Sequence, residues 1–251
     1  MVGAQVFSVT RDVWCIRRPS YLTCSYLVRT PDGIVLVDAG MDSSGRDILK
    51  GLEAMGADVN SVRSILLTHW HNDHAAGARA IQECCDAKAY CHEGDLSQLN
   101  RESARLGLRG KLGHIIPEWG FLVLFKGLLG EATPRAVLDP ETVHEGDTLS
   151  DYFEVIETPG HTPGHLSFYY KPEKMLFAGD ALAVVSDDVH FMARAVTPDV
   201  AEARRSMRKC LTMEIDTLCP GHRTPLTKGV PQKCEAMLKH IDSGGRWPLL
   251  G

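Results

Sequence analysis

Six consecutive residues of this chain carry four side chains that bind metal ions well. The segment from His69 to His74 holds three histidines and Asp73, and it follows the apolar run 65–67 and Thr68. Zinc and its neighbours among the transition metals take imidazole and carboxylate ligands, and imidazoles this close together are more stable around a cation than beside each other. A hydrated, histidine-rich loop is the alternative, and it would leave all four side chains uncoordinated. We therefore interpret the segment as part of a metal site.

Other histidines and aspartates also follow predicted strands. They are Asp38 after strand 34–37, His161 in a Pro/Gly-rich loop after strand 153–157, Asp180 after strand 175–178, and His222 after strand 217–219. Strand ends on one edge of a sheet converge even when they are far apart in sequence. A two-metal centre needs about this many donors, with ions ~3.5 to 4 Å apart. For Asp38 two interpretations stay open: a turn residue before the next helix, or a carboxylate that orients a ligating imidazole.

The elements that position these residues follow from the apolar patterns. Short runs rich in β-branched and aromatic residues predict strands at 6–9, 13–16, 24–28, 34–37, 64–67, 88–91, 137–138, 153–157, 166–170, 175–178 and 217–219, and a β pattern over 143–149 with a turn at 145–147. Helical spacing predicts helices at 43–55, 74–85, 95–108, 198–211 and 230–240. This alternation after an all-β start predicts sheets packed between helices.

Composition excludes several classes of protein. The chain has 251 residues, 44% hydrophobic and 24% charged, which predicts one large globular domain with or without an insertion. A formal net charge of −5 and no long basic block argue against nucleic acid as a partner. No apolar run approaches the ~20 residues of a membrane span, and no leader is recognisable, so a cytoplasmic location is expected. The 8 cysteines lack C-x-x-C spacing and are expected to be reduced thiols.

Residues 93–135 are expected to form a helical or apolar insertion that glycine and proline interrupt. Its aromatic, apolar patch includes Trp119, Phe121 and Phe125. Three interpretations stay open: a helix packed on the domain, a lid over a pocket for an apolar substrate, or a surface that makes a homodimer plausible.

The motifs, in their order, resemble the metallo-β-lactamase-fold hydrolase superfamily. They are Val37-Asp38-Ala39-Gly40, His69-x-His71-x-Asp73-His74, Thr158-Pro159-Gly160-His161-Thr162, Phe177-Ala178-Gly179-Asp180 and Pro220-Gly221-His222. The resemblance implies a single α/β domain over residues 1–251, a four-layer αββα sandwich of two mixed β-sheets flanked by helices. It also implies the ligand sets: His69, His71 and His161 on one ion, Asp73, His74 and His222 on the other, and Asp180 between them. His165 is not a ligand in this pattern, and His92, His114, His144, His190 and His240 match no motif.

The resemblance further implies two divalent cations, foremost zinc, with iron or manganese as alternatives. Two cations lower the pKa of a bridging water, so that a hydroxide is available near neutral pH and hydrolysis needs no serine or cysteine. Asp73 is the candidate catalytic residue, which orients this hydroxide or passes a proton to the leaving group.

The substrate follows from departures from known subfamilies. Asp180 stands where penicillin-hydrolysing members carry cysteine or serine, and residues 181–188 replace the basic glutathione-binding segment of the glyoxalase II type. Ala183 stands where acyl-homoserine lactonases have a tyrosine, and only 29 residues follow His222. We expect a small-molecule ester, thioester or lactone with an apolar acyl part. An acyl-homoserine-type lactonase, a hydroxyacylglutathione-type thioesterase and an iron-dependent persulfide dioxygenase are the alternatives.

Overall fold

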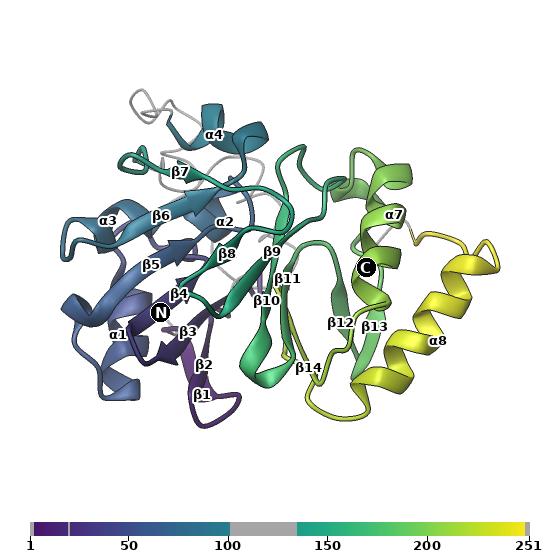
Figure 1. Cartoon of the computed structure of the whole chain (residues 1–251), viewed down its shortest axis with the longest axis horizontal. Helices are drawn as coiled ribbons and strands as arrows, with labels where there is room; N and C mark the ends of the chain where they lie inside the picture. Colours follow the sequence, from purple (N-terminus) through teal and green to yellow (C-terminus); the bar gives the residue numbers. More distant parts are fainter. Residues whose placement is uncertain (1–2, 20, 101–134, 249–251) are drawn as a thin grey trace. The chain divides into compact units, whose positions relative to one another are not determined.

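The computed structural model of the chain describes residues 3–19, 21–100 and 135–248 (Figure 1). The chain divides into two compact units, Met1–Tyr90 with Ser97–Glu141, and Cys91–Leu96 with Thr142–Gly251. Each unit is built on one mixed β-sheet. Most of the predicted insertion, with Trp119, Phe121 and Phe125, lies outside the described residues. The single domain therefore stays a prediction.

The first unit contains a seven-stranded sheet in the order β1-β2-β3-β4-β5-β6-β7. Its strands are β1 Gln5–Ser8, β2 Val13–Arg17, β3 Cys24–Thr30, β4 Gly33–Val37, β5 Val62–Leu66, β6 Lys88–Cys91 and β7 Glu141–Thr142. Strands β1 to β4 form an antiparallel meander, whereas β4, β5 and β6 run parallel. The carboxyl ends of β4 and β5 therefore lie at the same edge, where Asp38 and Thr68 follow them.

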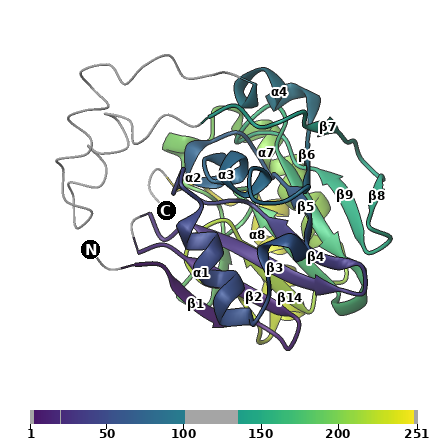
Figure 2. The ribbon, with the colours of Figure 1, turned by 90° about the vertical axis from the view of Figure 1, so that its left-hand side faces the viewer.

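Helix α1 (Arg46–Met55) confirms most of the helix predicted at 43–55, although it begins three residues later and Leu49, expected on its apolar face, is exposed. It buries Ile48, Leu52 and Met55 and ends at Gly56, whose φ of 68° suits a left-handed C-cap. The helix lies against β2 (Figure 2), and the approach is so close that a Cβ on Gly51 would overlap with the Ile16 side chain. The helix thereby covers one face of the sheet. Two shorter helices in the first half of the chain are η1 Val59–Ser61 and α4 Glu93–Leu99.

The helix predicted over residues 74–85 is wrong in one respect, because it is interrupted. The structure has two short helices, α2 Asn72–Ala75 and α3 Ala78–Gln82. At Gly77 between them, the N–H donates to the Gly40 carbonyl at 3.2 Å, and a Cβ would overlap with the Ala39 carbonyl oxygen. The interruption lets the residues after β4 approach α2, which carries His74. The His74 carbonyl accepts the N–H of Ala39 at 2.6 Å.

The second unit contains a five-stranded sheet in the order β14-β11-β10-β9-β8, with a separate hairpin β12-β13. Its strands are β8 Thr148–Leu149, β9 Phe153–Glu157, β10 Leu166–Tyr170, β11 Met175–Gly179, β12 Ala183–Val185, β13 Asp188–His190 and β14 Thr217–Pro220. Its helices are η2 Lys171–Glu173, η3 Arg194–Val196, α7 Val200–Leu211 and α8 Val230–Asp242. The predicted hairpin of β10 and β11 is confirmed. The strand predicted at 137–138 and the strand segment predicted at 143–144 are wrong, whereas the turn predicted at 145–147 and the strand segment 148–149 are confirmed.

Helices α7 and α8 lie side by side (Figure 1) and share one apolar core with the second sheet. Asp199 caps the N-terminus of α7, where its carboxylate accepts the N–H of Glu202 at 2.9 Å. The helix buries Met207 and Cys210. The hairpin β12-β13 was not predicted. Its turn residues Ser186 and Asp187 both have positive φ, a conformation that Asn-Gly pairs signal more clearly than Ser-Asp.

All eight cysteines are thiols, which confirms that they form no disulfide framework. Within residues 3–19, 21–100 and 135–248, no helix combines the length and apolar character needed to cross a membrane.

Replacing Gly77 by alanine tests whether the contact with Ala39 sets the path of the chain. The overlap with a backbone carbonyl cannot be relieved by a rotamer change, so we expect a loss of about 2 kcal/mol in the free energy of unfolding. This corresponds to a decrease in Tm of about 4 to 8 °C for a chain of this size. Circular dichroism melting in EDTA measures it. Gly3→Ala is the control, because a Cβ there meets only Lys50 Nζ at 3.6 Å; equal melting temperatures for the two variants would contradict the expectation.

Candidate metal centre

The first unit brings the side chains of the His69–His74 segment together. Strand β5 ends one residue before Leu67, and the chain then turns into α2 through His71. His69 Nε2 lies 3.1 Å from His71 Nδ1, and the rings of His69 and His74 have centroids 4.2 Å apart. His69 and His74 are buried, whereas His71 and Asp73 are half-buried. The segment therefore forms a compact group of nitrogen donors with one carboxylate beside it.

Asp38 orients His74. Its Oδ2 accepts a hydrogen bond from His74 Nδ1 at 2.8 Å, while its Oδ1 accepts the Thr68 N–H at 2.8 Å. The Thr68 hydroxyl also donates to Oδ2 at 2.8 Å. The proton on Nδ1 leaves a lone pair on His74 Nε2, which lies 3.6 Å from Asp73 Oδ2. Of the two interpretations of Asp38, these contacts favour the orienting carboxylate, since α1 begins only at Arg46.

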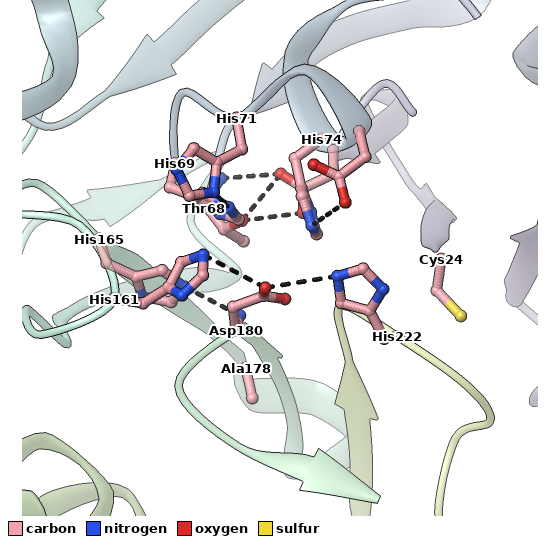
Figure 3. A network of polar contacts seen from close by, with 12 residues as sticks. Cys24, Thr68, His69, His71, His74, His161, His165, Ala178, Asp180 and His222 are labelled. Carbon is pink, nitrogen blue, oxygen red and sulfur yellow. Dashed lines mark hydrogen bonds and ion pairs between the residues drawn. The ribbon is translucent and has the colours of Figure 1, made fainter. Parts of the chain in front are cut away.

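The second unit gathers His161, His222 and Asp180. Asp180 Oδ2 lies 3.3 Å from His161 Nε2 and 3.3 Å from His222 Nε2 (Figure 3). Parallel pairing of β11 with β14, in which Gly179 faces Pro220, places Asp180 and His222 at the same edge of the sheet. His161 comes from the loop between β9 and β10, which pair antiparallel. One carboxylate oxygen is thus equally near two imidazoles.

Asp95 holds the loop that carries His161, and the sequence analysis missed it. Its Oδ2 accepts the Thr162 hydroxyl at 2.7 Å and its Oδ1 accepts the Gly164 N–H at 2.9 Å. A Cβ on Gly164 would lie 2.6 Å from the Asp95 nitrogen, so only glycine fits there. Asp95 is buried, but its sequence neighbourhood predicted a charged helix, and no local signal marked it.

A further group contains His92, His144 and Glu157. Glu157 Oε1 lies 3.1 Å from His92 Nε2 and 3.5 Å from His144 Nδ1. The Gly94 N–H donates to His92 Nδ1 at 3.0 Å, so the proton of the neutral ring is on Nε2 and is donated to Glu157. Burial raises the pKa of Glu157, but the Glu145 backbone N–H and His92 outweigh it, so this pKa lies below its usual range. The geometry is that of a hydrogen-bonded cluster whose His92 has no lone pair toward a cation.

The donors of the two units fit divalent cations by their chemistry. Imidazole nitrogens and carboxylate oxygens are the ligands that zinc, iron and manganese accept. The separations of 3.1, 3.3 and 3.6 Å between neighbouring donor atoms are close to the edge of about 3.3 Å of a tetrahedron with bonds of ~2.0–2.1 Å. Neighbouring donors within each unit could therefore share an ion.

Imidazoles and carboxylates at the strand ends of mixed α/β units are typical of metal-binding α/β proteins. A family model described as the metallo-beta-lactamase superfamily matches residues 22–222, and the chain belongs to this superfamily.

The chain is similar to several known members. It is 27% identical over 216 residues to the probable metallo-hydrolase YflN of Bacillus subtilis (strain 168), covering 78% of both chains. It is 27% identical over 224 residues to the lactamase-like protein aptB of Emericella nidulans, covering 87% of this chain and 56% of that protein. A metallo-beta-lactamase family protein from Thermus thermophilus has a TM-score of 0.66 at 23% identity, with 94% of this chain and 81% of that chain covered. The predicted αββα fold class is thereby confirmed.

Replacing Asp38 by asparagine tests its orienting role. An amide cannot accept all the hydrogen bonds that the two carboxylate oxygens accept, so His74 loses its fixed tautomer. We expect the affinity for Zn²⁺ to fall by about 10- to 100-fold, measured at pH 7 by competition with a chromophoric chelator. Asp58→Asn is the matched control, since the Asp58 side chain is exposed and accepts its hydrogen bonds from Asn60, outside the His69–His74 segment. Equal affinities of the two variants would rule out the role.

Proposed function

We propose that this chain is a dinuclear metal-dependent hydrolase of an ester, thioester or lactone. The observation that carries the proposal is Asp180 Oδ2, which lies 3.3 Å from the Nε2 atoms of both His161 and His222. In the superfamily pattern these two histidines belong to different ions. A carboxylate equally near both supports a bridging role for Asp180.

Seven residues would hold the two cations in this proposal. They are His69, His71 and His161 for one ion, Asp73, His74 and His222 for the other, and Asp180 between the ions. When bound, two divalent cations lower the pKa of water and polarise a carbonyl group, which is the chemistry that hydrolysis requires. The donors include no thiolate, so zinc, iron and manganese all suit them and supply decides among them.

Asp73 is the proposed catalytic residue. Its side chain is partly exposed, unlike that of His74, so its second oxygen can meet solvent. A carboxylate in this position accepts a proton from the attacking water and passes it to the leaving oxygen or sulfur. Asp38 holds the proton of His74 at Nδ1 and so keeps the Nε2 lone pair available.

The substrate proposal rests on the segment after Asp180. Ala181, Leu182, Ala183 and Val184 are buried, and Leu182 and Val184 belong to the apolar core around α7 and α8. This segment therefore offers no cationic side chain to an anionic group such as glutathione. The relatives named as metallo-hydrolases support hydrolysis but name no substrate. We propose a small-molecule substrate with an apolar acyl part.

Metal content and hydrolysis test the proposal together. We expect about two ions for each chain by elemental analysis, and hydrolysis that EDTA abolishes and Zn²⁺ or Mn²⁺ restores. Asp180→Ala should lower kcat/KM by at least about 100-fold, because it removes a charge shared by both ions. Asp216→Ala, an exposed aspartate of the same unit, is the control. Full activity of Asp180→Ala, or oxygen consumption by an iron-loaded protein in place of hydrolysis, would contradict a dinuclear hydrolase.

A panel of p-nitrophenyl esters, thioesters and lactones of rising acyl length tests the substrate class. We expect kcat/KM to increase with acyl length, because each buried methylene adds about 0.8 kcal/mol of transfer free energy. Trp119→Ala and Phe121→Ala should raise KM for the long acyl chains more than for acetyl esters, as a lid predicts. A flat dependence on length, or unchanged KM in both variants, would exclude the lid.

A further inference from the structure

We infer that His165 is a positioning residue that fixes the aim of the Asp180 carboxylate. The inference rests on the proposed function, since it concerns a proposed metal ligand. His165 lies at the end of the loop that carries His161, one residue before β10, and it matches no ligand position of the superfamily. Its contacts nevertheless lead to the turn that carries Asp180.

The hydrogen bonds of the His165 imidazole determine its tautomer. The Asp180 backbone N–H donates to His165 Nε2 at 2.9 Å (Figure 3). This nitrogen is therefore an acceptor, and the proton of the neutral imidazole is on Nδ1. His165 Nδ1 lies 2.7 Å from the Thr158 hydroxyl oxygen, to which it donates.

The Thr158 hydroxyl continues the hydrogen bonds from His165 through Ser167 to the backbone. Because Thr158 Oγ1 accepts from the ring, its own proton is donated to Ser167 Oγ, 3.0 Å away. Ser167 in turn donates to the Ala178 carbonyl at 3.1 Å. With these directions, the hydrogen bonds run continuously from the Asp180 N–H to the Ala178 carbonyl.

The relay of hydrogen bonds through His165, Thr158 and Ser167 has both of its ends on the backbone beside Gly179. It begins at the N–H of Asp180 and ends at the carbonyl of Ala178, so it encloses Gly179. At Gly179 the backbone has a φ of 50°, and the register of β11 with β14 shifts between Phe177 and Gly179. Such irregularities re-aim side chains at sheet edges. The relay therefore clamps the two peptides around the kink that directs Asp180 out of its strand.

Burial makes this clamp rigid. Thr158, His165 and Ser167 are each no more than 1% exposed, so water cannot replace a lost partner. The same loop is held at its other side by Asp95. The loop with His161 and the turn with Asp180 consequently form one hydrogen-bonded piece, which maintains the 3.3 Å separation between His161 Nε2 and Asp180 Oδ2.

The alternative is that the His165 ring only fills a buried volume. The variants therefore have to separate this packing role from the role as hydrogen-bond acceptor. His165→Leu keeps much of the volume but removes the acceptor for the Asp180 N–H. His165→Gln supplies an amide oxygen near the position of Nε2 and so keeps the acceptor. His190→Leu is the matched control, because His190 is an exposed histidine on β13 of the same unit.

The experiment uses the full chain loaded with Co²⁺, whose visible absorption reports ligand geometry. In His165→Leu we expect an altered Co²⁺ spectrum, an affinity for Co²⁺ lower by at least about 10-fold, as for other residues that orient ligands, and a lower kcat with KM changed less than about 2-fold. His165→Gln should recover most of the wild-type spectrum and affinity, and His190→Leu should match the wild type.

A wild-type spectrum and affinity in His165→Leu would overturn the inference and leave the proposed function intact. Equal losses in His165→Leu and His165→Gln would also overturn it, because the acceptor would then be irrelevant. If the wild type bound no Co²⁺, the proposed function itself would fail. Should His165→Leu not fold, as judged by circular dichroism, Thr158→Val replaces it: this variant removes the acceptor for Nδ1 and is expected to shift the Co²⁺ spectrum in the same direction.

Discussion

The approach of the Asp180 carboxylate to two imidazoles is the interaction on which the candidate site depends. An oxygen 3.3 Å from two ring nitrogens is stable where positive charge lies among the three groups, and costly where it does not. The first unit also has close donor pairs: nitrogens of His69 and His71 lie 3.1 Å apart, and the Asp73 carboxylate lies 3.6 Å from His74 Nε2. In both units, keeping the donors close together therefore costs folding free energy, and cation binding would offset this cost.

Unusual backbone conformations make these approaches geometrically feasible. Asp38 directly follows β4 and Gly179 is the last residue of β11, and these two residues have φ values of 55° and 50°. Gly77 and Gly164 lie where a side chain would overlap with backbone atoms. Strain and close contact of this kind persist only where surrounding hydrogen bonds over-determine the backbone, and they cluster at functional sites.

Each unit holds at least one of its donors in place through hydrogen bonds to residues that are not proposed ligands. In the first unit, Asp38 accepts from His74 Nδ1 and from Thr68. In the second, the relay from His165 to Ser167 holds the backbone on both sides of Gly179. In the first unit, the Asp38 carboxylate orients the His74 ring. In the second unit, hydrogen bonds to the backbone orient the Asp180 carboxylate. Both arrangements limit the movement of the proposed ligands.

The sequence by itself determined the donor types, their order and their location at strand ends, because strands and caps are encoded locally. The amphipathic helix ending at Gly56, the strands that precede Asp38 and Asp180, and the superfamily motifs all follow from residues close together in the chain. Only the tertiary structure decided the break at Gly77, the partner of Asp38, and the roles of Asp95 and His165. Each of these depends on a contact between segments remote in sequence, such as Asp95 with Gly164, and no local pattern encodes which remote group will arrive.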